Sequence, residues 1–297
     1  MRVVLTAVTA LALTVGLAGC GGDRSETADG PSVVASTAVW GSVAQDVVGD
    51  HGTVTTILDS AADDPHSYEA SPADAAEISD AALVVYNGGG YDHWVDDVLV
   101  DHPDARRVDA YALLPDTGAR PNEHVFYDVA IAKAVALQIA EQLADLDPDH
   151  ADSYHANADL FGESAAQILA SQRAIGVAHP GAAVAATEPV AHYLVANAGL
   201  TDKTPAGFAT AIEQDTDPPP ADVAAMLDLI GGRQVAALLY NPQTETAVTK
   251  RIRDAADAAS VPIVEVSETL PADTDYLTWQ RDTVRRLTEA LQHRPDR

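Results

Sequence analysis

The chain has 297 residues and a formal net charge of -28, from 45 acidic and 17 basic side chains. This balance argues against nucleic-acid binding, because phosphate contacts need basic residues. The chain holds a single cysteine, which excludes an intrachain disulfide and a cysteine metal cluster.

The first element in chain order is an export signal. Arg2 is followed by an apolar run over residues 3–18, which is shorter than the roughly 20 residues that span a bilayer. The run ends in "LAGC", which resembles a bacterial lipobox, where the cysteine is acylated and begins the mature chain. We therefore expect residues 1–19 to be a lipoprotein signal peptide and Cys20 to carry a lipid; an incidental Cys20 after a cleaved signal is the alternative. Residues 20–32 are small and polar, and we expect a flexible tether.

Strand-like and helical patterns alternate in the segment that follows. The expected strands are "SVVAST", "TVTTIL", "ALVVY" and "RRVDA", and the expected helices are "WGSVAQDVVGD", "SPADAAEISDA" and "YDHWVDDVLVDH". The third strand ends in a glycine turn, and Ser-Pro opens the second helix as an N-cap with Pro at the first helical position. This order predicts a mostly parallel sheet covered by helices.

Two helical stretches then follow without a strand between them, at residues 123–144 and 150–175. The second would be close to 40 Å long at about 1.5 Å per residue, long enough to link two lobes. The alternation then resumes, with strands expected at 182–187, 234–240 and 261–266 and helices at 189–198, 220–231, 244–259 and 274–292.

We therefore predict an α/β protein of two lobes, each a mostly parallel sheet flanked by helices, joined by one long linking helix. The expected boundaries are 33–147 for the N-terminal lobe, 148–175 for the linking helix and 176–297 for the C-terminal lobe.

Four polar residues stand close behind strands or at the start of a helix: His66, His124, Glu188 and Glu268. In open parallel sheets, ligands bind beyond the carboxyl ends of the strands. Two imidazoles and two carboxylates, two from each lobe, would hold a divalent cation. Carboxylates also neutralise the ion, which a buried site requires.

The segments that carry these residues resemble a known family. "DPHSYEASPAD" is close to the motif D-P-H-x-Y-E-x-x-P-x-D, and "VVYNGGGYDHWVDDVL" is similar to an NG-x-G-x-E-x-W segment. "EHVFYD", "ATEPVAHYLVANAGL" and "VSETL" follow in the places of three further ligand motifs. The chain thereby resembles the metal-binding solute-binding lipoproteins of zinc/manganese-type ABC transporters, cluster A-I, over essentially its whole mature length. It departs from them at Glu123, where a proline is usual.

This resemblance implies a metal site formed by His66, His124, Glu188 and Glu268. His192 lies four residues after Glu188 on the same helix face and is an alternative ligand. A ligating histidine usually passes its second N–H to a carboxylate or carbonyl. Glu69 and Asp128 are the candidates for that role; either is equally explained as a helix-face charge.

The resemblance also implies the function: capture of Mn²⁺ or Zn²⁺, with Fe²⁺ as a further option, and delivery to an ABC permease and its ATPase subunit. We expect a monomer, held to the outer face of the cell membrane by the lipid on Cys20, without nucleic-acid partners and without enzymatic activity. A secreted metal-dependent hydrolase and a surface adhesin of the same fold are the alternatives. No His-rich loop and no nucleophile motif such as G-x-S-x-G or H-E-x-x-H is present in the sequence.

Overall fold

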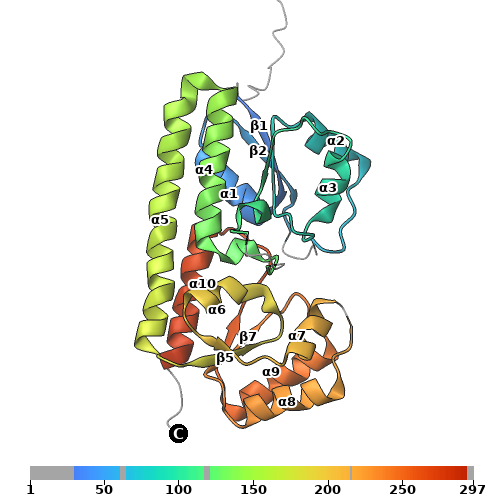
Figure 1. Cartoon of the computed structure of the whole chain (residues 1–297), viewed down its shortest axis with the longest axis vertical. Helices are drawn as coiled ribbons and strands as arrows, with labels where there is room; N and C mark the ends of the chain where they lie inside the picture. Colours follow the sequence, from blue (N-terminus) through green and yellow to red (C-terminus); the bar gives the residue numbers. More distant parts are fainter. Residues whose placement is uncertain (1–29, 61–64, 117–120, 215, 293–297) are drawn as a thin grey trace, which may run out of the picture.

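The computed structural model describes residues 30–60, 65–116, 121–214 and 216–292. The predicted signal peptide and Cys20 lie outside the described residues, as does all of the predicted tether before Gly30. The described chain forms two lobes stacked along the long axis, with one long helix running beside both (Figure 1). No helix in the described part of the chain is both long and apolar enough to cross a membrane.

The N-terminal lobe is built on a parallel sheet with strand order β2-β1-β3-β4. Its strands are β1 (Ser32–Thr37), β2 (Thr53–Leu58), β3 (Leu83–Tyr86) and β4 (Arg107–Asp109). Its helices are α1 (Ala38–Val48), α2 (Pro72–Asp80) and α3 (His93–Leu99), and a 3₁₀ turn, η1, covers Tyr111–Leu113. The predicted capping of α2 is present, because the Ser71 hydroxyl accepts the Asp74 amide and Asp74 accepts the Ser71 amide.

Alternate side chains of these strands enter two different cores, as the period of a strand requires. Val33 and Ala35 of β1 join a large cluster with α1 and α4, whereas Val34 joins a smaller cluster with α2 and α3. Both faces of the sheet are therefore covered by helices, which explains why every residue of β3 is buried.

The C-terminal lobe repeats this plan, with strand order β6-β5-β7-β8, all parallel. Its strands are β5 (Ala183–Ala186), β6 (Thr201–Asp202), β7 (Ala237–Tyr240) and β8 (Ile263–Glu265). Its helical elements are η4 (Pro189–Ala191), α6 (His192–Asn197), α7 (Ala206–Glu213), α8 (Pro220–Gly231), α9 (Ala247–Ala259) and α10 (Tyr276–Gln292). The short strand β6 and the helix α7 are not among the elements expected from the sequence.

The helix expected over residues 123–144 begins later than predicted. Residues Val125–Tyr127 form a separate 3₁₀ turn, η2, and α4 covers Val129–Leu146. The reason is local: Asp128 has an extended backbone, and its carboxylate accepts the Ala130 amide at 3.0 Å as the N-cap of α4. His124 therefore lies in the loop before η2 and not in the first turn of a long helix.

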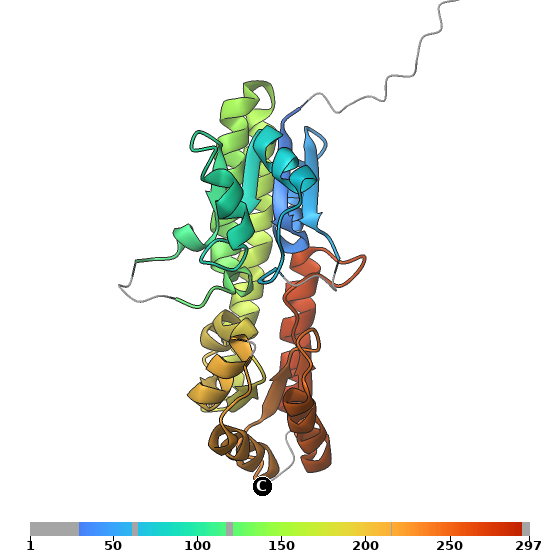
Figure 2. The same ribbon diagram turned by 90° about the vertical axis from the view of Figure 1, so that its right-hand side faces the viewer.

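The linking helix is α5, which covers Ala151–Ala178 after a 3₁₀ turn at Pro148–His150, η3. Helix α10 runs beside α5 from the junction of the two lobes along the C-terminal lobe (Figure 2). The first residue of α10 contacts the other lobe directly, because the Tyr276 amide donates to Ser42 of α1 at 2.9 Å and its hydroxyl donates to the Phe126 carbonyl at 2.8 Å.

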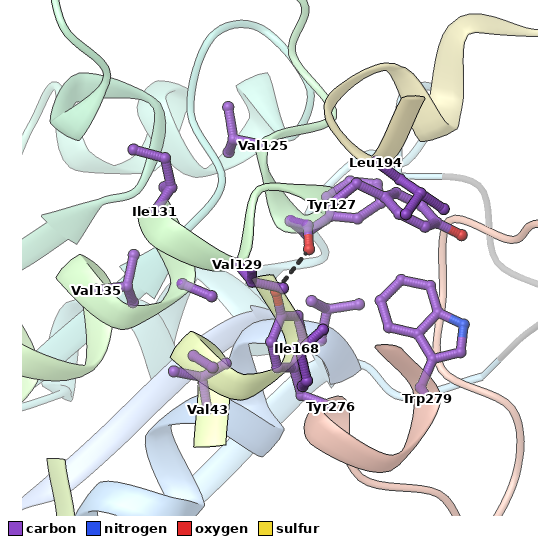
Figure 3. Close-up of a cluster of buried hydrophobic side chains, with 14 of the residues drawn as sticks. Val43, Val125, Tyr127, Val129, Ile131, Val135, Ile168, Leu194, Tyr276 and Trp279 are labelled. Atoms are coloured by element: carbon purple, nitrogen blue, oxygen red, sulfur yellow. Dashed lines mark hydrogen bonds between the residues drawn. The ribbon is translucent and has the colours of Figure 1, made fainter. Parts of the chain in front are cut away.

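One hydrophobic cluster runs through both lobes. Side chains from α1, α4, α5, α6 and α10 meet in it, among them Val43, Val135, Ile168, Leu194 and Trp279 (Figure 3). Relative motion of two lobes is expected unless their interface is large and apolar, and this interface is continuous with the core. The arrangement therefore favours small movements of the lobes around the space between them.

Candidate metal centre

His66 is presented by the loop that follows β2, between the two lobes. Its ring lies edge-on to the ring of Tyr91, with 4.7 Å between centroids. Tyr91 follows Gly88, Gly89 and Gly90, which have φ of 73°, 69° and 96°, a conformation that glycine adopts without strain. The glycine turn after β3 thus delivers the aromatic ring against which the His66 imidazole packs.

His124 is held by the loop that precedes η2. Asn122 Oδ1 accepts the His124 amide at 2.9 Å and lies 3.1 Å from Nδ1 of the same residue. Asn87 supports this loop from the glycine turn, because its side chain donates to the Glu123 carbonyl at 2.8 Å. With Nδ1–H donated to an amide oxygen, the other ring nitrogen, Nε2, carries the lone pair that a metal ion needs.

The two carboxylates come from the carboxyl ends of strands in the C-terminal lobe. Glu188 stands two residues after β5 and opens η4, and Glu268 lies three residues after β8. Both are buried. The Glu268 amide donates to Gln243 Oε1 at 2.6 Å, which fixes the turn that points this side chain toward the N-terminal lobe.

Three of these side chains converge. Oε2 of Glu268 lies 3.3 Å from Nε2 of His66 and 3.7 Å from Nε2 of His124. The three residues form the one group in the described chain whose potential ligand atoms all lie within 4.8 Å of each other. We call His66, His124 and Glu268 the three-donor cluster. Glu188 lines the same cavity but its carboxylate is not part of that group.

The chemistry of these donors fits a cation. Oε2 of Glu268 is buried and makes no well-aligned hydrogen bond with the described residues, although two imidazoles face it. A buried carboxylate oxygen without a donor is destabilised unless a positive charge lies against it. A divalent ion placed among the two Nε2 atoms and Oε2 would be within reach of all three donors at once.

The electrostatics of the site favour the protonation states that bind a metal ion: a neutral His124 and an ionised Glu268. Burial lowers the pKa of His124 to about 4. The charge of Glu268 works to raise this pKa, whereas the imidazoles of His66 and His192 lower it further. Burial tends to raise the pKa of Glu268, but His66 and His124 outweigh it and hold that pKa below its usual value. Burial raises the pKa of Glu188 to about 7, and the charge of Glu268 adds to this. At neutral pH, His124 is therefore uncharged and Glu268 is ionised.

The cavity is small. Its volume is about 40 Å³, and its lining is formed by the four predicted ligands with Pro189, Ile212, Glu213 and Thr244. One probe-sized water needs about 10–15 Å³, and drug-sized organic ligands occupy sites of roughly 300 Å³ or more. The space accommodates an ion with little else.

The structure does not include the other predicted residues in the three-donor cluster. Glu69 is exposed, and Asp128 caps α4. His192 is exposed on α6, where its ring lies edge-on to Tyr193. The partner of His124 Nδ1 is Asn122, and the carboxylate near His66 Nδ1 is Glu123, at 3.7 Å.

Sequence reasoning missed four residues that surround the site: Asn122, Glu123 as a neighbour of His66, Glu213 and Asn241. Asn241 follows β7 directly, so the strand-end rule that selected Glu188 would also have selected it. Glu213 had no such signal, because it ends α7, a helix that the sequence pattern did not reveal.

Comparison with known proteins identifies the family to which the chain is similar. A family model described as "Zinc-uptake complex component A periplasmic" matches residues 33–290, which is most of the chain. The match includes all four predicted ligands and both sheets.

Individual relatives are more distant. Manganese-binding lipoprotein MntA of Bacillus subtilis (strain 168) is 27% identical over 246 residues, which cover 76% of this chain and 76% of that protein. A protein of the same name from Halalkalibacterium halodurans is 31% identical over 154 residues, 48% of this chain and 50% of its own. Iron-binding protein YfeA of Yersinia pestis is 27% identical over 146 residues, 47% of each. The chain thus spans about half the length of the last two.

Solved structures share the fold. The periplasmic zinc binding protein TroA from Treponema pallidum matches with a TM-score of 0.75 and 18% identity, over 88% of this chain and 99% of that one. A mutant structure of the laminin-binding adhesin Lmb from Streptococcus agalactiae matches with a TM-score of 0.74 and 24% identity, over 88% and 100%. Both neighbours have the same two-lobed architecture, as predicted.

Proposed function

The chain belongs to the family of the zinc-uptake complex component A, periplasmic, and we propose that it captures a divalent transition-metal ion between its two lobes for delivery to an ABC importer. The proposed ligands are His66, His124, Glu268 and Glu188. The ion is the cargo of the protein and not a cofactor of a reaction.

One observation carries this proposal: two imidazole Nε2 atoms from the N-terminal lobe face Oε2 of Glu268 from the C-terminal lobe, at 3.3 and 3.7 Å. Nitrogen and oxygen donors of this kind suit Zn²⁺, Fe²⁺ and Mn²⁺. Because the donors come from both lobes, binding an ion would hold the lobes together. A permease that contacts both lobes would then distinguish the loaded from the empty form.

The family is one of metal-binding solute-binding proteins, which are carriers and not enzymes. The hydrolase alternative is therefore set aside, and the cavity of about 40 Å³ gives a physical reason, since it offers an organic substrate no room beside the ion. We do not propose an adhesin role for this chain, because its likeness to Lmb is a likeness in fold alone.

The remaining partners follow from the transport role. We propose that the protein works as a monomer on the outer face of the cell membrane, held by a lipid on Cys20, and that its partners are the permease and the ATPase subunit of the importer. The curated relatives MntA are named as lipoproteins, and Cys20 stands at the end of the apolar run where a lipid would be attached.

For the metal, we propose Mn²⁺ as the physiological cargo in preference to Zn²⁺, with tight Zn²⁺ binding in vitro. Two carboxylates make the site harder than one with a third imidazole, and a carboxylate ligates through one or both oxygens, which suits the higher coordination numbers of Mn²⁺. The Irving–Williams order nevertheless makes Zn²⁺ the stronger binder at such sites. The relatives are named for manganese and for iron, and the family is named for zinc. Our proposal of Mn²⁺ therefore rests on the ligands of the site and not on the relatives.

The test is to purify the lipid-free chain, remove metal with a chelator and titrate Mn²⁺ and Zn²⁺ by calorimetry. We expect one ion per chain for each metal, with Zn²⁺ the tighter. Elemental analysis of protein isolated from its native host then identifies the cargo, with manganese expected. A chelator-treated chain that binds neither ion would overturn the proposed function.

A further inference from the structure

Asn241 lies at the centre of the acidic half of the site. It follows β7 directly, and β7 lies between β5 and β8 in the sheet. Its side chain is 1% exposed, and its amide nitrogen Nδ2 donates to two carboxylates, Glu188 Oε2 at 2.6 Å and Glu268 Oε1 at 3.1 Å. Three adjacent strand ends thus contribute one amide and two acids to a single hydrogen-bonded group.

The orientation of this amide is determined by its neighbours. Asn241 Oδ1 accepts the Gln243 amide at 3.0 Å, and the Asn241 backbone amide donates to Thr187 Oγ1 at 3.0 Å. With Oδ1 engaged by a backbone donor, the NH₂ group is the part of the side chain that faces the acids.

The two carboxylates therefore differ. Oε1 of Glu268 accepts a hydrogen bond from Asn241, and Oε2 faces the imidazoles of the three-donor cluster. Oε2 of Glu188 accepts the shorter of the two hydrogen bonds from Asn241, and the Glu188 carboxylate lies outside that cluster. Two buried like charges repel each other, and a shared donor offsets part of that repulsion.

We propose that Asn241 is a positioning residue that presents Glu268 as the resident acidic ligand and holds Glu188 beside the site as an exchangeable one. When an ion enters the three-donor cluster, Glu188 turns its other oxygen, Oε1, to the metal while Oε2 keeps its hydrogen bond to Asn241. The inference rests on the proposed function and adds an order of engagement: three donors first, Glu188 last.

Loss of an outer hydrogen-bond partner typically lowers metal affinity about 10- to 100-fold. We expect Asn241→Leu, similar in size but without donors, to weaken Mn²⁺ binding by about that factor. Zn²⁺ should weaken less, because a tetrahedral ion is satisfied by three protein donors and a water. Asn197→Leu is the matched control: its amide donates to Gln172 on α5, away from the cavity, and affinity should remain unchanged.

Two readouts separate positioning from mere structural support. If Asn241 acts through Glu188, then Asn241→Leu should cause a smaller loss in a Glu188→Gln background than in the wild type. The visible spectrum of the Co²⁺-loaded protein, which reports coordination number, should also change in Asn241→Leu and stay the same in Asn197→Leu.

A comparison without any change at Asn241 keeps the test valid if Asn241→Leu fails to fold. Glu268→Gln should lower Mn²⁺ affinity at least about tenfold more than Glu188→Gln, because it removes a resident ligand. Equal losses, or unaltered binding by folded Asn241→Leu, would overturn this inference while wild-type binding still supports the proposed function. A wild type that binds no ion would overturn both.

Discussion

Tyr127 and Ser267 exchange two hydrogen bonds across the two lobes: the tyrosine hydroxyl donates to the Ser267 carbonyl at 3.0 Å and accepts the Ser267 amide at 3.2 Å. Tyr127 lies three residues after His124, and Ser267 immediately precedes Glu268. This contact therefore sets the distance between an imidazole of one lobe and a carboxylate of the other.

Tyr127→Phe should remove both hydrogen bonds between Tyr127 and Ser267. The change removes the hydroxyl and leaves a backbone amide and carbonyl without their partner, which costs about 1–3 kcal/mol of unfolding free energy. Metal affinity should fall as well, because His124 and Glu268 lose their common anchor. Urea unfolding and calorimetric titration measure the two effects.

Tyr154→Phe provides the comparison for this change. It removes hydrogen bonds to the His51 carbonyl and to Asp147 near the start of α5, far from the cavity. Its stability should fall while its metal affinity is retained. An equal loss of metal affinity in both variants would contradict the role given to the Tyr127–Ser267 contact.

His66→Ala and His124→Ala should each abolish metal-induced stabilisation. Binding to the folded state raises the unfolding free energy by RT ln(1 + [L]/Kd), about 2.7 kcal/mol when the free ion is at 100 times Kd. Removal of one of three convergent donors should raise Kd by orders of magnitude, so the melting shift disappears. His155→Ala, at a histidine paired with Glu141 outside the site, should keep the full shift. A normal shift in His66→Ala would rule that residue out as a ligand.

Glu188→His should move the metal preference toward Zn²⁺. A third imidazole replaces a hard oxygen donor and suits tetrahedral Zn²⁺ better than Mn²⁺. Titration of both ions into wild type and variant should show weaker Mn²⁺ binding and a larger ratio of Zn²⁺ to Mn²⁺ affinity. Equal Mn²⁺ affinity in the two proteins would mean that Glu188 does not set the preference and would make His192 or a water the better candidate for that position.

The burial of Asp92 should make the metal-free protein less stable as pH rises from 5 to 7. Burial raises the pKa of Asp92 to about 6 against an ordinary value of 3.8, even though the side chain accepts the Asn87 and Gly88 amides. A carboxyl group with a raised pKa in the folded state contributes stability that is complete below about pH 4 and is lost as pH rises through about 6. For Asp92 alone, the expected loss between pH 5 and pH 7 is about 1 kcal/mol.

Asp92→Asn should reduce that pH dependence, measured by urea unfolding in the presence of a chelator. Asp74→Asn is the matched control: slight burial of this helix-capping carboxylate is outweighed by hydrogen bonds from Ser71 and Tyr68, which hold its pKa below the usual value. It is ionised throughout this range, so its removal should leave the slope unchanged. Identical slopes in wild type and Asp92→Asn would refute the assignment.

Cys20→Ser should separate the protein from the membrane. Without a thiol there is no lipid attachment, so the variant should appear in the medium or as an unprocessed precursor. Membrane fractionation and the mass of the mature chain distinguish these outcomes from normal anchoring. A variant that stays in the membrane fraction at the normal mature size would show that another feature anchors the chain.

Local sequence determined much of this architecture. The apolar strand runs, the Ser71 cap and the strand–helix alternation depend on neighbours a few residues away, and the predicted parallel sheets and long linking helix are present. His66, His124, Glu188 and Glu268 were identified from motifs and strand ends, and the structure brings their side chains to one cavity.

Only the tertiary structure decided how these groups meet. His66 and Glu268 are 202 positions apart, and the 3.3 Å between their side chains depends on the packing of α5 and α10 against both lobes. Asn122 and Asn241 became partners of the site in the same way: an amide has no charge pattern or periodicity, and its role depends on which atoms the fold places beside it. Short elements such as α7 lack enough turns for a clear period, so Glu213 reached the cavity without a signal in the sequence. Contacts within a turn of helix follow from the local order of residues, whereas contacts between lobes follow from packing of the whole chain.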